Sequence, residues 1–255
     1  MYNLNDQGIN NTNCKYRRSL NHNLRLIANY KATSHLIGIK KFKKGFLLVL
    51  ERNPVNGIHF ILKGKVKVFN TSINNKIQVL RLASKGDLIG LSSLNSLHYW
   101  SSAMAVESVK TYFINLKNLK TILKTNIKLS FLFVNFLALY LRYYEMRQKH
   151  LNLFPASERV IDALLLTAYK FGKKTSQGLE LSICTSRKEI ASFANTTKEK
   201  VIRTLSNLRV KKYISIEGKK IIIKDKGALV DKLKKYCCTN NLPEEFNLCY
   251  PNFFY

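Results

Sequence analysis

The 255-residue chain has few acidic residues, with 15 Asp and Glu against 43 Lys and Arg, and a formal net charge of +28. A field of that sign attracts polyanions and speeds their encounter, so nucleic acid is the first partner class and an anionic membrane surface the second. The codon bias of an AT-rich genome, which favours Lys, Asn and Ile, is an alternative source of the excess charge. Charge alone therefore does not identify the partner.

Cysteine is also scarce, with five residues at uneven spacing: Cys14, Cys184, Cys237, Cys238 and Cys249. The odd number and a polar N-terminus without a secretory pattern predict a reducing, cytoplasmic location and no disulfide framework. The last three cysteines contain no C-x-x-C pair, and adjacent cysteines rarely form a tetrahedral site. We therefore expect no metal and no cofactor.

Long hydrophobic runs are absent. The longest apolar stretch, residues 129–141, is interrupted by Ser130 and Asn135 and falls short of the ~20 residues that span a bilayer. We expect a buried or dimer-forming helix there, and no membrane partner. Hydrophobic residues still make up 46% of the chain, which is typical of a folded protein.

Residues 35–116 alternate apolar and polar side chains with a period of two, between turn residues such as Asn53-Pro54 and Gly86-Asp87. Short alternating runs at this spacing predict an all-β sandwich or barrel. The apolar members of the runs are Phe46, Leu48, Leu50, Phe60, Leu62, Val66, Val68, Ile77, Val79, Tyr112 and Ile114. Residues 1–34, which are polar and rich in Asn at the start, predict an N-terminal arm and a short helix.

The period changes to a helical one over residues 117–154. Steps of four and three join Leu129, Phe133, Phe136, Tyr140 and Tyr143, a spacing typical of a coiled-coil seam. The segment predicts one connecting helix that forms a dimer. The alternative is that this face packs on the chain's own β-domain.

Pro155 stops that helix and marks a hinge. Residues 155–227 then read as a second domain, which begins with an amphipathic helix that ends at Gly172. Lys173 to Gly178 is predicted to be a polar loop. Residues 228–255 are predicted to be a C-terminal tail, which either packs on the body or stays mobile.

Two Ser/Thr-x-x-Glu sequences lie ten residues apart in the second domain, from Ser186 to Glu189 and from Thr196 to Glu199. In such a capping box the hydroxyl accepts a hydrogen bond from an unpaired helix N–H, so each sequence predicts a helix start. Asn195, between the two predicted helices, is a residue that tolerates positive φ. The pattern predicts a helix-turn-helix, whose second helix enters the major groove of DNA.

The exposed positions on the second helix carry side chains suited to DNA. Arg can bind guanine bidentately, Glu can accept from cytosine N4, and Lys and Thr can hold phosphates. Two isoleucine runs around Gly218 predict a hairpin wing with basic residues at its tip. The predicted DNA-binding residues are Ser186, Arg187, Thr197, Lys198, Glu199, Lys200, Arg203 and Lys219.

The segments 185–191 and 201–205 resemble the DNA-binding domain of the cyclic-AMP receptor protein and fumarate–nitrate regulator (Crp/Fnr) superfamily. Upstream, Gly45, Gly64 to Val68, Gly86 to Gly90 and Ser102-Ala103 fit its β-roll in order and spacing. The resemblance covers about residues 35–227. It implies an α+β fold: an N-terminal β-roll like a cyclic-nucleotide-binding jelly roll, a long dimerisation helix, and a C-terminal winged helix-turn-helix.

The resemblance implies that Lys198, Glu199 and Arg203 read base edges, whereas Thr197 contacts phosphate. Lys200 stands where the family usually has Thr, and Asn195 replaces the usual turn Gly. These departures are compatible with DNA binding. Lys200, however, argues against the assumption that this chain binds the same operator sequence as other members of the family.

The effector positions depart further from the family. Cyclic-nucleotide binders have a Gly-Glu pair for the ribose and an Arg before Ser-Ala for the phosphate, but here these positions are Gly90-Leu91 and Ser101-Ser102. Because burying an uncompensated phosphate is costly, we expect no ordinary binding of cyclic AMP. The family's iron–sulfur branch uses an N-terminal cysteine cluster, of which this chain has only Cys14. The effector stays unknown.

The sequence therefore predicts a transcription regulator that binds a pseudo-palindromic operator in double-stranded DNA as a homodimer, with RNA polymerase as a further candidate partner. The alternative is a degenerate relative that binds nucleic acid non-specifically through its basic surface. An enzyme is not expected, because the chain has no Gly-rich phosphate loop, no H-E-x-x-H and no G-x-S-x-G.

Overall fold

The computed structural model describes residues 36–237, and eight of its strands form two antiparallel four-stranded sheets in the N-terminal half. One sheet has the order β1-β8-β3-β6 and the other β2-β7-β4-β5. The strands are β1 (Gly38–Phe42), β2 (Leu47–Val49), β3 (Gly57–Lys63), β4 (Val66–Thr71), β5 (Ile77–Ala83), β6 (Leu88–Ile89), β7 (Ser102–Ala105) and β8 (Val109–Asn115), with a 3-10 turn, η3 (Leu91–Ser93), after β6.

The two sheets share one apolar core, because alternate side chains of each strand point inward. Ile61 of β3, Val68 of β4 and Ala103 of β7 are all buried in this core. This confirms the predicted all-β domain, which we call the β-roll. The predicted N-terminal arm and short helix, residues 1–34, lie outside the described residues.

The predicted single helix over 117–154 is wrong, because the structure has two: α2 (Leu116–Thr125) and α3 (Ile127–Leu153). The two helices are bent by 117° at Asn126. The Asn126 side chain accepts a hydrogen bond from the N–H of Leu129 at 3.0 Å and so caps the second helix. No single helix in the described part of the chain is long and apolar enough to cross a membrane; only the bent pair passes that test together.

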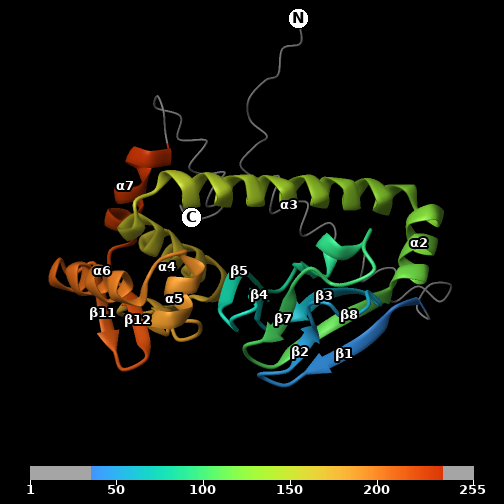
Figure 1. Cartoon of the computed structure of the whole chain (residues 1–255), viewed down its shortest axis with the longest axis horizontal. Helices are drawn as coiled ribbons and strands as arrows, with labels where there is room; N and C mark the ends of the chain where they lie inside the picture. Colours follow the sequence, from blue (N-terminus) through green and yellow to red (C-terminus); the bar gives the residue numbers. More distant parts are fainter. Residues whose placement is uncertain (1–35, 238–255) are drawn as a thin grey trace, which may run out of the picture.

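The predicted coiled-coil seam of α3 packs on the chain's own β-roll. Leu129, Phe133 and Phe136 are buried with Ile58 and Phe60 of β3, as the alternative prediction from the sequence had it. A different face of α3 is exposed. Figure 1 shows α3 running along one side of the molecule, from the β-roll to the C-terminal lobe.

The C-terminal lobe combines helices with a four-stranded sheet of order β11-β12-β10-β9. Its elements are α4 (Ala156–Phe171), β9 (Lys173–Thr175), β10 (Gly178–Leu181), α5 (Arg187–Phe193), α6 (Lys198–Val210), β11 (Ile214–Glu217), β12 (Lys220–Ile223) and α7 (Lys226–Cys237). The helix predicted to end at Gly172 is confirmed as α4.

Two predictions in this lobe are wrong. Lys173 to Gly178 is not a loop but the start of a hairpin, since β9 pairs with β10. The domain also does not end at residue 227. Helix α7 buries Leu229, Val230 and Leu233 in the core of the lobe, because these residues recur on one helical face. The tail predictions beyond residue 237 lie outside the described residues.

The β-roll and the C-terminal lobe are docked along the free edge of β5. The Ser192 hydroxyl of α5 donates to the Ile77 carbonyl at 2.6 Å and accepts from the Val79 N–H at 2.8 Å. Gln78 donates to the Ser192 carbonyl at 2.7 Å. One side chain thus pairs with the edge of the strand as a neighbouring strand would.

Ion pairs and apolar contacts extend this docking. Lys67 of β4 contacts Glu189 of α5 at 2.7 Å, and Lys170 of α4 contacts Asp87 at 2.6 Å. Val79 and Leu82 belong to the same apolar core as α4 and α5. The position of the C-terminal helices is therefore tied to the β-roll.

Candidate nucleic-acid interface

The first helix of the motif, α5, begins at the predicted cap. Ser186 accepts a hydrogen bond from the N–H of Glu189 at 3.2 Å. The Glu189 carboxylate accepts from the Ser186 hydroxyl and from Lys67, both at 2.7 Å. Burial raises the pKa of Glu189, but these hydrogen bonds outweigh it and hold that pKa below its ordinary value. Glu189 therefore serves the docking of the two lobes as well as the cap.

The turn between the helices adopts the predicted geometry. Asn195 has a φ of 47°, a conformation that Asn tolerates better than most residues. Ala191 and Ala194 are buried where α5 meets α6. The Thr196 N–H donates to the Ala191 carbonyl at 3.0 Å and closes the turn.

The second cap lies one residue later than predicted. Thr197, not Thr196, caps α6, and its hydroxyl accepts from the Lys200 N–H at 3.3 Å. Thr196 is still part of the turn, so its hydroxyl is not in the cap position. Glu199 bonds with its own backbone N–H and with the Thr197 hydroxyl, and these bonds hold the pKa of Glu199 below its ordinary value. The carboxylate is thus an acceptor at neutral pH.

Helix α6 buries one face and leaves the other open. Val201, Leu205 and Leu208 pack into the lobe. Lys198, Glu199 and Arg203 are exposed together on the first two turns. This polar face has the donors and the acceptor that reading of base edges requires.

The predicted wing is present as a hairpin of β11 and β12, with Ile216 opposite Ile221. Gly218 adopts a φ of 57° at its tip, and Lys219 beside it is exposed. The tip is therefore basic and free to approach a phosphate. Arg187 is half-buried and bonds the Thr185 carbonyl at 3.3 Å.

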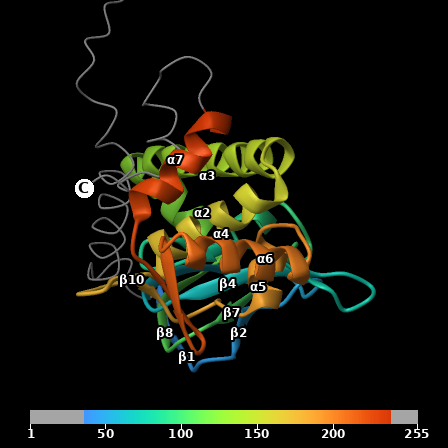
Figure 2. The same ribbon diagram turned by 90° about the vertical axis from the view of Figure 1, so that its left-hand side faces the viewer.

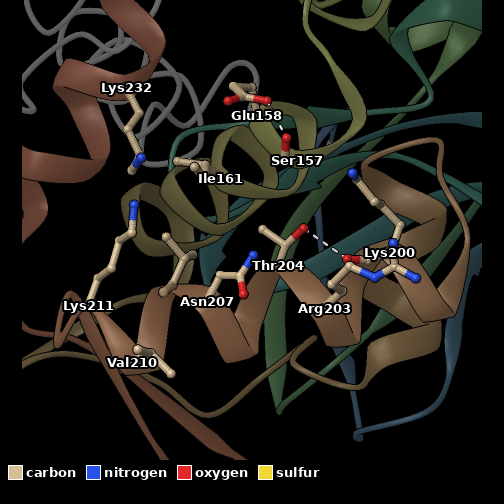
Figure 3. Close-up of a pocket in the computed structure, with 11 residues that line it drawn as sticks. Ser157, Glu158, Ile161, Lys200, Arg203, Thr204, Asn207, Val210, Lys211 and Lys232 are labelled. Carbon is tan, nitrogen blue, oxygen red and sulfur yellow. Dashed lines mark hydrogen bonds between the residues drawn. The ribbon is translucent and has the colours of Figure 1, made fainter.

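A groove of about 330 Å³ runs between α6, the start of α4 and α7. Figure 3 shows Lys211 and Lys232 pointing toward one another at one end, with Lys200 and Arg203 at the other. One carboxylate, Glu158, lines it against these four cations. The groove therefore suits an anion rather than a cation.

Three residues that sequence analysis missed hold the motif in place. Arg159 donates to the carbonyls of Ala194 and Asn195, each at 3.1 Å, and so fixes the turn. Buried Asp162 of α4 pairs with Arg147 of α3, which also donates to the Phe193 carbonyl at 2.9 Å. A charged residue in an otherwise apolar helix is a sequence signal for a buried ion pair or hydrogen bond. The partners of these three residues are distant in the sequence, so the signal did not identify them.

Comparison with known proteins agrees with this geometry. The family model described as cyclic nucleotide-binding domain matches residues 39–126, and the one described as Crp-like helix-turn-helix domain matches residues 158–232. The first match covers the β-roll and α2, and the second covers most of the C-terminal lobe.

The chain belongs to the Crp/Fnr superfamily.

Curated relatives in this superfamily are transcription regulators. The anaerobic regulatory protein of Bacillus subtilis is 27% identical over 187 residues, which covers 72% of this chain and 79% of the relative. The global nitrogen regulator of Nostoc is 27% identical over 188 residues, covering 72% and 84%. The chain is thus a transcription regulator of the Crp/Fnr type, with a helix-turn-helix DNA-binding domain.

Solved structures share the fold. A CRP-family transcriptional regulator from Thermus thermophilus has a TM-score of 0.67 at 20% identity, covering 76% of this chain and 95% of that one. The c-di-GMP responsive regulator CLP of Xanthomonas campestris has a TM-score of 0.65 at 15% identity, covering 74% and 94%. The predicted β-roll, helices and winged helix-turn-helix are confirmed as the fold class.

The predicted effector positions of this Crp/Fnr regulator hold no charged side chain. Leu91 is buried in the apolar core, and Ser101 is half-buried. The buried Ser102 hydroxyl already accepts from the Glu51 N–H at 3.0 Å. Gly90 adopts a φ of 85°. Within the described residues, no group of three or more His, Cys, Asp or Glu could hold a metal ion.

Proposed function

We propose that this Crp/Fnr regulator reads a specific DNA sequence through α6. The observation that carries the proposal is the exposed face of Lys198, Glu199 and Arg203 on a helix whose opposite face is buried. Arg203 pairs with guanine and Glu199 with cytosine, and such contacts discriminate between bases. Thr197, Lys200 and the wing residue Lys219 hold phosphates, together with Ser186 and Arg187 at the start of α5.

The exposed face of α3 supports a homodimer. Ile127, Phe131, Val134 and Leu141 are between 59% and 82% exposed, and their steps of four, three and seven place them in one stripe along the helix. Exposed apolar stripes of this kind mark protein contacts. A second copy that packs its α3 on this stripe gives two recognition helices related by a twofold axis, which matches a pseudo-palindromic operator.

The input signal is unlike cyclic AMP. Ser101 and Ser102 supply no cation for a cyclic phosphate, and Leu91 supplies no carboxylate for a ribose. We do not propose an enzyme, because the chain has no Gly-rich phosphate loop, no H-E-x-x-H and no G-x-S-x-G. Burial raises the pKa of the Cys184 thiol to about 12, so this cysteine is not the thiolate that a nucleophile requires.

A gel-shift competition at physiological salt tests sequence reading. We expect a selected operator to resist competition by random DNA, because specific sites bind roughly 10³–10⁷ times more tightly than non-specific DNA. Equal competition by both DNAs would favour the alternative, a relative that binds nucleic acid through charge alone.

Light scattering tests the dimer. We expect a mass of two chains for the wild type and of one chain for Leu141→Glu, which places a charge in the apolar stripe. Lys149→Glu, at an exposed position on the same helix, is the control for a changed charge. A monomeric wild type would contradict the homodimer.

A further inference from the structure

We propose that the C-terminal segment of this chain, residues 238–255, binds in the basic groove between α4, α6 and α7 and competes there with DNA. The segment follows the match to the Crp-like helix-turn-helix domain, which ends at residue 232. The groove has a volume of about 330 Å³. Lys200 and Arg203 line it and are also assigned to DNA, so the proposal rests on the proposed function.

One end of the groove brings two lysines together without a carboxylate between them. Figure 3 shows Lys211, the C-cap of α6, and Lys232 of α7 pointing toward one another. Neither lysine forms an ion pair with a carboxylate of residues 36–237. Glu158, the carboxylate in the lining, accepts a hydrogen bond from the Ser157 hydroxyl instead. Because like charges repel, a bound carboxylate is favourable at this end.

The C-terminal segment has the charge that this end of the groove needs. Residues 238–255 contain Glu244 and Glu245 and no Lys or Arg, although the chain as a whole has a net charge of +28. The two carboxylates are adjacent in the sequence, so one stretch of chain presents both of them to Lys211 and Lys232. The segment therefore matches the two lysines in sign and in number.

The lining of the groove is also partly apolar. Its apolar side chains are Ile161, Leu208 and Val210. Val210 lies next to Lys211 in the sequence and is 79% exposed, so water contacts a branched apolar side chain there. In the segment, Phe246 follows the two carboxylates directly, and a phenylalanine ring buries a large apolar area when it covers such a surface. An acidic pair followed by an aromatic residue thus suits a groove with both kinds of lining.

The segment is long enough to reach the groove from the end of α7. In Figures 1 and 2, α7 runs from the winged sheet toward α3 and ends on the α3 side of the lobe. Lys232 precedes the last residue of α7, Cys237, by five residues, which is about 8 Å along a helix axis. Glu244 follows Cys237 by seven residues, and an extended chain of that length spans up to about 25 Å. A short tether of this kind gives an effective concentration on the order of millimolar.

The segment and DNA exclude one another, because both need the same side chains. Lys211 follows Lys200 by 11 residues along α6, a distance of about 17 Å. An extended segment of about five residues covers that length. A segment whose carboxylates contact Lys211 therefore extends across Arg203 with the residues that follow. In this closed state Arg203 is covered, and the apparent affinity for DNA falls in proportion to the fraction of open protein.

Zero-length cross-linking tests the docking without DNA, because a carbodiimide joins a carboxylate to an amine only where the two are in contact. The full chain is treated at physiological salt, digested and analysed by mass spectrometry. We expect a peptide with Glu244 or Glu245 joined to a peptide with Lys211 or Lys232. A mixture of isotopically labelled and unlabelled protein distinguishes links within one chain from links between two copies. Links only to lysines outside the groove, or only between copies, would overturn the proposal.

Operator affinity tests the competition, with Glu244→Gln/Glu245→Gln as the test variant. We expect its affinity to rise about 2–30-fold over the wild type, the range for the loss of two exposed ion pairs. The control, Glu107→Gln/Asp231→Asn, removes the same charge at positions that do not line the groove. Its affinity should rise by less than about twofold, because salt screens distant charges. An unchanged affinity for the test variant, or an equal rise in the control, would overturn the proposal.

The lysines of the groove give a second test, in which the expected effect opposes the change of charge. Lys211→Gln/Lys232→Gln removes two positive charges but should also raise operator affinity about 2–30-fold, because it releases the segment. Combining it with Glu244→Gln/Glu245→Gln should add nothing further. Weaker binding by the lysine variant would show that DNA itself occupies this end, which would overturn the proposal. Failure of the proposed function is distinct, because the wild type would then not prefer the operator to a scrambled duplex of equal length, whereas the cross-links would be unaffected.

Discussion

Replacing Asp162 with alanine should lower the free energy of unfolding by about 3–5 kcal/mol, the cost of leaving a buried cation unpaired. Asp162 is 0% exposed, and its carboxylate pairs with Arg147 and, at 3.0 Å, with His150. Arg147 is 5% exposed, so water does not replace the lost carboxylate. The change therefore strains the junction of α3, α4 and α5, where Arg147 also holds the Phe193 carbonyl.

Urea unfolding followed by circular dichroism measures this loss. At about 2–4 °C per kcal/mol for a chain of this size, the melting temperature should fall by about 6–20 °C. The double variant Arg147→Met/Asp162→Leu is the matched control, and it should recover most of the loss because apolar residues replace a buried ion pair at little cost. An Asp162→Ala variant within about 1 kcal/mol of the wild type would refute the reasoning, as would a double variant no more stable than the single one.

Three further predictions concern the β-roll and its docking. Burial, followed by the charge of Lys40, lowers the pKa of His59 from 6.5 to about 4. As the pH falls, the unfolded chain therefore binds a proton at this histidine before the folded protein does. About 3 kcal/mol of stability is lost between pH 7 and pH 4. His59→Gln should flatten that part of the stability–pH curve, and an unchanged curve would refute the assignment. Gly64→Ala should cost more than about 1 kcal/mol in urea unfolding, because φ is 98° and a Cβ would lie 2.3 Å from the Ser108 carbonyl oxygen; a neutral effect would contradict this. Ser192→Ala removes two hydrogen bonds from the edge of β5 at about 1–3 kcal/mol, and limited proteolysis between the lobes should become faster, whereas an unchanged cleavage rate would show that the docking does not depend on Ser192.

Local patterns predicted most of the fold. The alternation in residues 35–116 located the strands, because one face of each strand is buried and the pattern has the period of the pleat. Ser186 and Asn195 located the helix-turn-helix, because capping and positive φ depend on the residue itself and its near neighbours. The exposed face of α6 followed from the spacing of its apolar residues.

The errors lie where two local solutions compete or where tertiary contacts decide. Thr196 and Thr197 are chemically identical caps, and the length of the preceding turn selects the second. Asn126 breaks the long helix. An asparagine in a helical pattern does not by itself predict a break, because it can lie inside a helix as well as cap one. The apolar residues of α3 occupy more than one face, and only the packed β-roll shows which face is covered. The Ser192 and Lys67 contacts join residues more than one hundred positions apart, so no sequence window contains them.

Selection of binding sites from a random DNA pool, with wild-type protein and with Arg203→Ala, tests the central claim most directly. The account predicts an inverted-repeat motif for the wild type. In the variant the motif should lose definition at one base position in each half, at a cost of about 1–3 kcal/mol. No enriched motif, or an Arg203→Ala motif identical to that of the wild type, would contradict sequence reading by α6.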